Sequence, residues 1–281
     1  MRSFAPRTLE EYAAALREFT PQSKIVSGGT DFVIALRRGK FAPDILLSPA
    51  QIPELREIEL TQTRLRIGAM ACMSDIAKRL THVPEFRAIA DAAANVGTPQ
   101  IRNRATVAGN LCNASPAGDM LPVAWLYGAE LELLCADGTR KCVPAKQFVL
   151  GPQKTALAPQ QAVIGILFDR SRCAGFRSAF RKIGFRSYVS ISRESMGMLL
   201  RLAEGGTVGQ ARIALGAVGS TPIRALEAEE MMRGHVLDDA LRQAVTESVA
   251  ATIQANCRPA NRLYKTEAAR GLVADVFAAL D

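Results

Sequence analysis

The 281-residue sequence contains few of the residues that usually carry catalysis. It has only two histidines, His82 and His235, and neither lies in a recognisable catalytic pattern. It has no Gly-x-Ser-x-Gly nucleophile elbow and no Gly-Lys-Ser/Thr phosphate loop. These absences argue against a serine hydrolase and against a nucleoside triphosphatase.

The six cysteines do not form a metal-binding pattern. They occur at positions 72, 112, 135, 142, 173 and 257, with no C-x-x-C or C-x₄-C spacing. Such spacings are typical of zinc sites and iron–sulfur clusters, so neither is expected in this chain. Most of the cysteines are expected to be reduced core thiols.

Long apolar runs are also absent. No uninterrupted stretch approaches the roughly 20 residues needed to cross a bilayer, and Met1 to Pro6 lacks the apolar core of a signal peptide. We therefore expect a cytoplasmic protein without a membrane span. With 48% apolar and 22% charged residues, the chain can bury a normal core as one large or two modest domains.

The net charge of +8 is spread along the sequence. Acidic residues separate most of the lysines and arginines, and aromatic residues are not interleaved among them as on single-strand binding surfaces. This distribution predicts no nucleic-acid binding. It is typical of a solvated surface or of a face that meets an acidic partner.

Two segments rich in glycine and small polar residues stand out. The first runs from Lys24 to Asp31 and contains Gly28-Gly29-Thr30, and the second runs from Ala105 to Asp119, directly after Arg102-Asn103-Arg104. A ligand can approach backbone N–H groups closely only where side chains are small, and consecutive amides can then bind phosphate oxygens. One such segment alone would be an ordinary turn, but the pair indicates a diphosphate site.

The first segment lies in an expected strand–glycine–helix unit. The spacing predicts a helix from Thr8 to Phe19, a strand from Lys24 to Ser27, a helix from Phe32 to Arg38 and a strand from Ile45 to Leu47. A helix that begins just after the glycines presents unpaired amides to an anion. We assign residues 1–55 to a small lobe.

Residues 56–170 are expected to form a larger lobe. The patterns predict strands over 65–67 and 162–168, helices over 73–80, 85–96 and 122–127, and a hairpin of 129–135 with 140–143 around Asp137-Gly138. Residues 100–115 are expected to be extended backbone and loop. The domain boundary is placed near residue 170.

Residues 171–281 are expected to form a separate α+β domain. Strands are predicted over 175–183, 190–202 and 208–218, as a small antiparallel sheet. Thr221-Pro222 is predicted to start the first helix, and helical spacing recurs over 237–253 and 267–280.

The order of the motifs resembles the FAD-binding medium subunits of molybdenum hydroxylases of the xanthine dehydrogenase and carbon monoxide dehydrogenase type. The resemblance rests on Val26-Ser27-Gly28-Gly29-Thr30-Asp31, Leu65-Arg66-Ile67-Gly68-Ala69, Gln100-Ile101-Arg102-Asn103, Ala105-Thr106-Val107-Ala108-Gly109-Asn110 and Ala114-Ser115-Pro116-Ala117-Gly118-Asp119. It continues through Phe180-Arg181-Lys182-Ile183 and Ala211 to Val218. It implies an α+β fold: a two-lobed FAD-binding domain of the PCMH type, then a small antiparallel sheet packed with C-terminal helices.

The same resemblance implies a set of FAD-binding residues and no catalytic or metal-binding ones. The two glycine segments would bind the pyrophosphate, Asp119 would accept a hydrogen bond from a ribityl or ribose hydroxyl, and Lys182 would lie near the flavin. Cys112 is expected to be a small wall residue, and Val163 or Ile164 to pack near the ring edge. The full set is Ile25, Val26, Ser27, Gly28, Gly29, Thr30, Asp31, Phe32, Thr106, Val107, Ala108, Gly109, Asn110, Cys112, Ser115, Asp119, Val163, Ile164 and Lys182.

The sequence departs from the family pattern in three places. Ala108 replaces the first of two usual glycines, Gln160-Gln161 replaces acidic residues, and Ala269-Arg270 stands at a frequent Tyr-Arg pair. The implied function is an electron-transfer subunit that works with a [2Fe–2S] subunit and a molybdopterin-binding large subunit, with NAD⁺ or another acceptor. A free-standing FAD oxidoreductase and a flavin-free assembly or interaction protein of the same fold are the alternatives.

Overall fold

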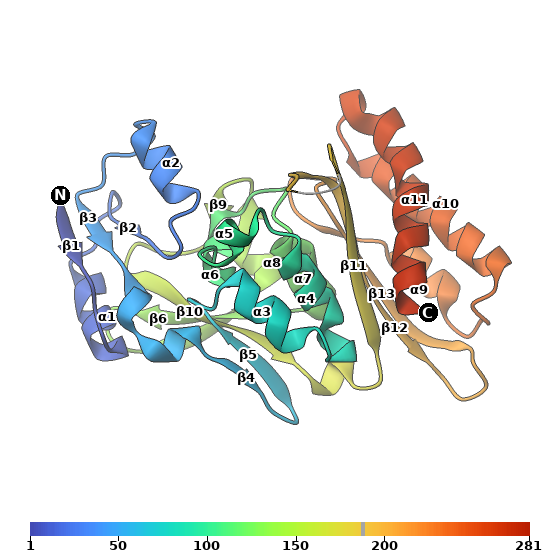
Figure 1. Cartoon of the computed structure of the whole chain (residues 1–281), viewed down its shortest axis with the longest axis horizontal. Coiled ribbons are helices and arrows are strands. Elements are labelled where there is room, and N and C mark those ends of the chain that lie inside the picture. The colour runs from blue at the N-terminus through green and yellow to red at the C-terminus, as the bar shows by residue number, and fades with distance from the viewer. Residues whose placement is uncertain (187–188) are drawn as a thin grey trace.

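The computed structural model describes residues 1–186 and 189–281. The chain begins with a small lobe, at the left of Figure 1, that contains a three-stranded parallel sheet of order β1-β3-β2. Its elements are β1 (Arg2–Phe4), α1 (Leu9–Arg17), β2 (Lys24–Ile25), α2 (Phe32–Arg37) and β3 (Ile45–Leu47). The Thr8 hydroxyl accepts the Glu11 N–H and caps α1, as predicted.

The larger lobe is built on a five-stranded antiparallel sheet of order β4-β5-β10-β6-β7. The strands are β4 (Ile58–Leu60), β5 (Arg64–Gly68), β6 (Glu130–Cys135), β7 (Arg140–Pro144) and β10 (Gln161–Asp169). A two-stranded sheet pairs β8 (Val149–Gly151) with β9 (Lys154–Thr155). The helices are α3 (Met73–Leu80), α4 (Arg87–Ala94), α5 (Pro99–Arg102), α6 (Val107–Asn113), α7 (Met120–Tyr127) and α8 (Ala145–Phe148).

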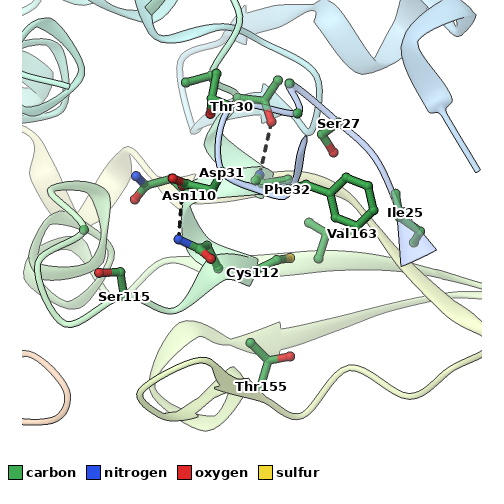
Figure 2. A pocket seen from close by; sticks show the side chains of 18 of the residues that line it. Ile25, Ser27, Thr30, Asp31, Phe32, Asn110, Cys112, Ser115, Thr155 and Val163 are labelled. Carbon is green, nitrogen blue, oxygen red and sulfur yellow. Dashed lines mark hydrogen bonds between the residues drawn. The ribbon is translucent and has the colours of Figure 1, made fainter. Parts of the chain in front are cut away.

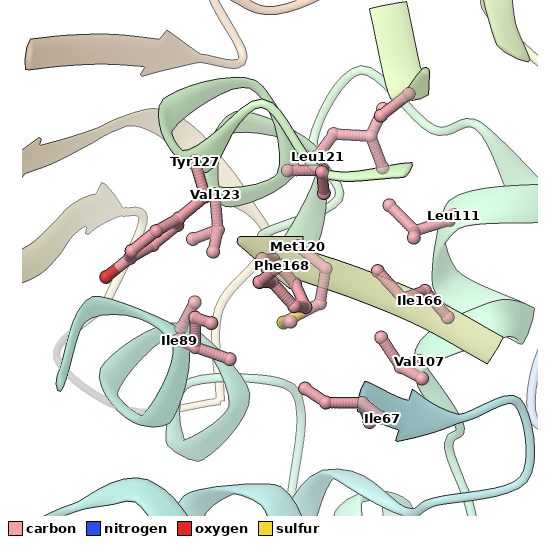
Figure 3. Close-up of a cluster of buried hydrophobic side chains, with 14 of the residues drawn as sticks. Ile67, Ile89, Val107, Leu111, Met120, Leu121, Val123, Tyr127, Ile166 and Phe168 are labelled. Carbon is pink, nitrogen blue, oxygen red and sulfur yellow. The ribbon is translucent and has the colours of Figure 1, made fainter. Parts of the chain in front are cut away.

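The central strand β10 is buried on both faces. Figure 3 shows Ile166 and Phe168 among the residues of the larger core. The rings of Phe168 and Tyr127 pack edge to face there, with their centres 5.7 Å apart. Ile164 instead belongs to the core of the small lobe. Neighbouring strand residues alternate between faces, and a register shift between Val163 and Gly165 changes the phase of that alternation, so Val163 lies in the same core as Ile166 and Phe168 while Ile164 lies in the other.

A four-stranded antiparallel sheet of order β11-β12-β13-β14 follows, with helices on both sides (Figure 1). Helices α4 and α7 contact one face, and α11 contacts the other, which explains why β12 is apolar at successive positions. The elements are β11 (Arg177–Gly184), β12 (Ser192–Leu202), β13 (Val208–Gly216), β14 (Ile223–Arg224), α9 (Leu226–Met232), α10 (Asp239–Asn256) and α11 (Arg262–Leu280).

Two local predictions were wrong. Residues 100–115 are largely helical, because Thr98 caps α5 and Thr106 caps α6 through their hydroxyls, despite the poor helix propensity of Gly109 and Asn110. Pro222 does not begin a helix, since Ile223–Arg224 pairs with β13 and the helix starts only at Leu226. The α+β architecture itself is confirmed.

Two other findings concern the sequence as a whole. All six cysteines are free thiols, although only Cys173 and Cys257 are fully buried. Over residues 1–186 and 189–281, no helix is long and apolar enough to cross a bilayer. The division at residue 170 is not tested by the fold and stays a prediction.

Candidate functional site

A cavity of about 780 Å³ is lined by residues of the small lobe, the larger lobe and the C-terminal sheet. Figure 2 shows Ser27 and Thr30 of the first segment on one side and Thr155 of β9 on the other. A volume of several hundred Å³ is in the range of cofactor pockets.

Most of the predicted binding residues line this cavity. Val26, Val107 and Ile164 do not, and Val107 and Ile164 are fully buried in core clusters. Those that line it are Ile25, Ser27, Gly28, Gly29, Thr30, Asp31, Phe32, Thr106, Ala108, Gly109, Asn110, Cys112, Ser115, Asp119, Val163 and Lys182.

The first glycine segment packs directly against the backbone that precedes the second. A Cβ atom at Gly28 would lie 2.0 Å from the carbonyl oxygen of Arg104, so no larger residue fits there without a backbone shift. Gly29 has a φ of +74°, which favours glycine. The Asn113 side-chain amide also donates to Asp31 Oδ2 at 3.2 Å and ties the two segments together.

The second segment is a capped helix start. The Thr106 hydroxyl accepts the Gly109 N–H at 3.1 Å, and a Cβ atom at Gly109 would lie only 2.9 Å from that hydroxyl. The same Cβ position lies 3.9 Å from the Cβ of Ser27, so the two segments meet at the cavity surface. We call this surface the glycine wall: Ser27, Gly28, Gly29, Thr106, Ala108, Gly109 and Asn110.

One buried side-chain atom of the glycine wall has no hydrogen-bond partner among residues 1–186 and 189–281. The buried Asn110 side-chain oxygen accepts no hydrogen bond from the described residues, and a buried acceptor of this kind normally has one. A ligand with hydroxyl or N–H donors would satisfy it. FAD carries such donors as well as a diphosphate, so the residues present fit FAD.

Three polar or charged side chains from distant elements also line the cavity and contact one another. Lys182 of β11 donates to Asp119 Oδ2 at 2.7 Å and to the Asn95 carbonyl at 2.8 Å, and the Ser192 hydroxyl donates to Asp119 Oδ1 at 2.5 Å. Burial raises the pKa of Asp119, and the hydrogen bonds from Lys182 and Ser192 oppose that rise. We call Asp119, Lys182 and Ser192 the ionic wall.

The Asp119 side chain does not cap α7, because it is turned toward Lys182 and Ser192. Its contact with Lys182 joins the larger lobe to the C-terminal sheet beside the cavity. Lys182 is therefore paired rather than free, with its side chain 10% exposed and that of Asp119 6% exposed.

Several lining residues were not predicted from the sequence. Asn113 lay within a glycine segment that could have suggested it, but Tyr12, Thr155, Ser192 and Ile191 carry no local signal. Cys112 lies in the cavity lining, and burial raises the pKa of its thiol to about 12, so it stays protonated near neutral pH.

The departures from the family pattern fall in different places. Gln161 lines the cavity, whereas Gln160 donates to the Arg17 carbonyl. Ala269 is fully buried, and Arg270 pairs with Glu247 at 3.0 Å, which links α10 and α11. The Ala269-Arg270 pair thus lies outside the cavity lining.

The fold and the cavity define a flavoprotein of the two-lobed FAD-binding type followed by an α+β domain. Residues 1–168 match the family described as "FAD binding domain in molybdopterin dehydrogenase", and residues 178–280 match "CO dehydrogenase flavoprotein C-terminal domain". The chain belongs to this family: it is an FAD-binding oxidoreductase subunit of the molybdenum hydroxylases, of the xanthine dehydrogenase type.

Individual relatives agree with this assignment. The chain is 31% identical to the nicotinate dehydrogenase FAD-subunit of Eubacterium barkeri, over 98% of this chain and 94% of that one. It is 28% identical to the xanthine dehydrogenase/oxidase of Gallus gallus, over 85% of this chain but only 18% of that longer protein. The structure of carbon monoxide dehydrogenase from Hydrogenophaga pseudoflava lacking the Mo-pyranopterin moiety matches with a TM-score of 0.87 and 27% identity, over 100% of this chain and 96% of that chain.

Proposed function

We propose that the cavity between the glycine wall and the ionic wall is the FAD site. The observation that carries this proposal is the meeting of two glycine segments, about 80 residues apart in sequence, at one cavity surface. Backbone N–H groups of the first segment and the amino end of α6 would hold the diphosphate. Asn110 would accept a hydrogen bond from the cofactor.

The ionic wall would orient the flavin end. FAD, when bound, would supply the redox chemistry. Lys182 would place a positive charge near the ring, but its contact with Asp119 offsets part of that charge. The pair would therefore set how strongly the chain favours negative charge on the ring.

The proposed reaction role is an electron relay within a heteromeric enzyme. A molybdopterin-binding large subunit would oxidise a substrate, a [2Fe–2S] subunit would carry the electrons, and this chain would deliver them to NAD⁺ or another acceptor. The names of the relatives support a role as one subunit, since the Eubacterium barkeri protein is called an FAD-subunit. The longer Gallus gallus protein contains a matching region within a single chain.

Purification of the native assembly through a tag on this chain tests the proposal. We expect a yellow preparation that releases FAD on denaturation and contains iron and molybdenum in fixed ratio to flavin. A folded protein that shows no flavin absorbance after incubation with FAD would contradict the cofactor site. A flavin-loaded monomer that turns over a substrate without metals would contradict the relay.

A further inference from the structure

Residues 115–119, which lie between α6 and α7, are held in part by the end of β13. The Ala217 N–H, one residue past β13, donates to the Pro116 carbonyl at 3.0 Å. Pro116 stands between Ser115 and Ala117, and both of these neighbours line the cavity. The end of the C-terminal sheet therefore contacts the backbone of a cavity wall that belongs to the larger lobe.

The same end of β13 also packs against the start of α7, just beyond Asp119. A Cβ atom at Gly216 would lie 2.7 Å from the side chain of Pro122, so only glycine lets the two backbones come this close. We call Gly216 and Ala217 the β13 corner. The corner contacts the chain before Asp119 and after it, and Asp119 itself lines the cavity.

The β13 corner has an unfavourable backbone conformation. Ala217 has a φ of +58°, in the left-handed region that glycine adopts readily and alanine does not. Such a conformation persists only where surrounding contacts hold it. Here the Ala217 N–H is bound to Pro116, and the Ala217 carbonyl accepts a hydrogen bond from the Lys265 ammonium. These two hydrogen bonds stabilise the left-handed turn.

Lys265 reaches the β13 corner from the far side of the C-terminal sheet. It lies near the amino end of α11, which packs on that sheet (Figure 1), and only 7% of the residue is exposed. Burial lowers the pKa of Lys265, whereas the charge of Glu194 on β12 raises it. A buried ammonium group requires a hydrogen-bond partner, and the Ala217 carbonyl provides one.

We infer that Lys265 is a positioning residue for the FAD site, acting through the β13 corner on residues 115–119. The inference rests on the proposed function. Lys265 is not among the residues that line the cavity, so its effect on the cofactor passes through the corner. Without the lysine, Ala217 would lose one of the two contacts that hold its left-handed conformation, and the hydrogen bond to Pro116 would weaken with it.

Titration of the full chain with FAD tests this inference. In Lys265→Met we expect the dissociation constant for FAD to rise at least about tenfold, the size of a lost hydrogen bond from a charged donor. The matched control is Val276→Ala, because Val276 is a fully buried residue farther along the same helix. It should weaken the packing of α11 but change the dissociation constant by no more than about twofold.

The outcomes of this titration separate the inference from the proposed function. Equal FAD affinity in Lys265→Met and the unsubstituted protein would overturn the inference and leave the FAD site intact. An equal loss of affinity in Lys265→Met and Val276→Ala would also overturn it, because general loosening of α11 would then explain both. An unsubstituted protein that binds no FAD would contradict the proposed function and the inference with it.

Rescue by a second substitution separates positioning from packing. Ala217→Gly removes the unfavourable contact of the Cβ atom, since glycine adopts a φ of +58° readily. Added to Lys265→Met, it should tighten FAD binding about fivefold, because the left-handed turn no longer depends on the lysine. A folded double variant that binds FAD no better than Lys265→Met would overturn the inference.

Hydrogen exchange of the unsubstituted chain provides a test that needs no variant to fold. Coupling between two sites is reciprocal, so FAD must stabilise the β13 corner if the corner supports FAD binding. Saturating FAD should slow exchange of the Ala217 N–H at least about fivefold more than that of the Val208 N–H, which donates to the His235 carbonyl at the other end of β13. Equal slowing at the two amides would overturn the inference.

Discussion

The glycine wall and the ionic wall enclose the same cavity but are built in opposite ways. The glycine wall depends on residues without a Cβ atom. Gly28 lets its backbone pack against the Arg104 carbonyl, and Gly109 leaves room for the Thr106 hydroxyl that caps α6. The ionic wall depends on side chains, with Lys182 and Ser192 of the C-terminal sheet holding Asp119 of the larger lobe. The glycine wall forms part of the cavity surface, and the ionic wall joins the C-terminal sheet to the larger lobe beside the cavity.

This difference determines how each wall fails. In the glycine wall a substitution adds atoms, so its cost is steric and its first effect is a displaced backbone. In the ionic wall a substitution leaves a buried charge without its partner. Variants of the glycine wall therefore test the close packing of the two glycine segments, and variants of the ionic wall test the buried ion pair.

The largest effect is expected from Lys182→Met, which leaves Asp119 buried with only Ser192 as its partner. Loss of one member of a buried ion pair costs about 3–5 kcal/mol in free energy of unfolding. The control is Arg181→Met, because Arg181 also reaches across to the larger lobe, to Asp91 at 2.9 Å, but is 37% exposed. Chemical denaturation should show a loss of about 1 kcal/mol or less for the control. Equal losses of unfolding free energy in the two variants would show that the buried Lys182–Asp119 pair contributes no more to stability than the exposed Arg181–Asp91 pair.

For the glycine wall, Gly28→Ala should cost about 3 kcal/mol, because its Cβ atom would overlap the Arg104 carbonyl. Bound FAD should fall together with the melting temperature. Gly271→Ala in α11 is the control, since nothing lies within 4 Å of its added Cβ, and it should stabilise the helix by about 0.5–1 kcal/mol. A Gly28→Ala protein with unchanged stability and full flavin would rule out close packing of the two segments.

Glu194 provides a contrast to Asp119, because neither of its carboxylate oxygens has a partner among the described residues. Burial raises its pKa from 4.5 to about 7, against the opposing charge of Lys265. Between these values the unfolded chain loses a proton that the folded chain keeps, so stability falls as the pH rises through this window. Glu194→Gln should remove this dependence.

Relative to the unsubstituted protein, the Glu194→Gln variant should therefore gain about 2–3 kcal/mol between pH 5 and pH 8, since each pKa unit corresponds to about 1.4 kcal/mol. Urea unfolding at both pH values measures this difference. Parallel stability curves for the two proteins would show that Glu194 titrates at its ordinary pKa.

The smallest effect is expected at the helix cap of the glycine wall. Thr106→Ala should cost about 1 kcal/mol, because the Gly109 N–H loses its acceptor. Asp238→Ala removes an equivalent cap from α10, outside the cavity lining, and should cost a similar amount. Flavin titration should show weaker binding only for Thr106→Ala. Equal affinity in both variants would remove Thr106 from the binding surface.

The two walls also differ in how far the sequence predicts them. The glycine wall is encoded locally, so the small residues around Gly28 and Gly109 indicated it, even though the helical state of residues 107–113 was missed. That error arose because side-chain capping by Thr106 outweighed the low helix propensity of the segment. The resemblance to a family suggested Asp119 and Lys182 but not their mutual contact.

Long-range contacts limited the remaining predictions. Ser192 is 73 residues from Asp119, and nothing in its own neighbourhood marks it as a partner. A register shift in β10 places Val163 in the same core as Ile166 and Phe168 and Ile164 in the other, and the run of apolar residues alone does not reveal that shift. Both features follow from pairing between elements, whereas helices such as Met73–Leu80 follow from local spacing.

A crystal structure of this chain with FAD tests the central claim most directly. We predict the diphosphate between the Gly28–Gly29 turn and the amino end of α6, within hydrogen-bond distance of backbone N–H groups of both. We also predict that the cofactor donates a hydrogen bond to the Asn110 side-chain oxygen. A diphosphate bound elsewhere, with the two glycine segments touching only solvent, would contradict it.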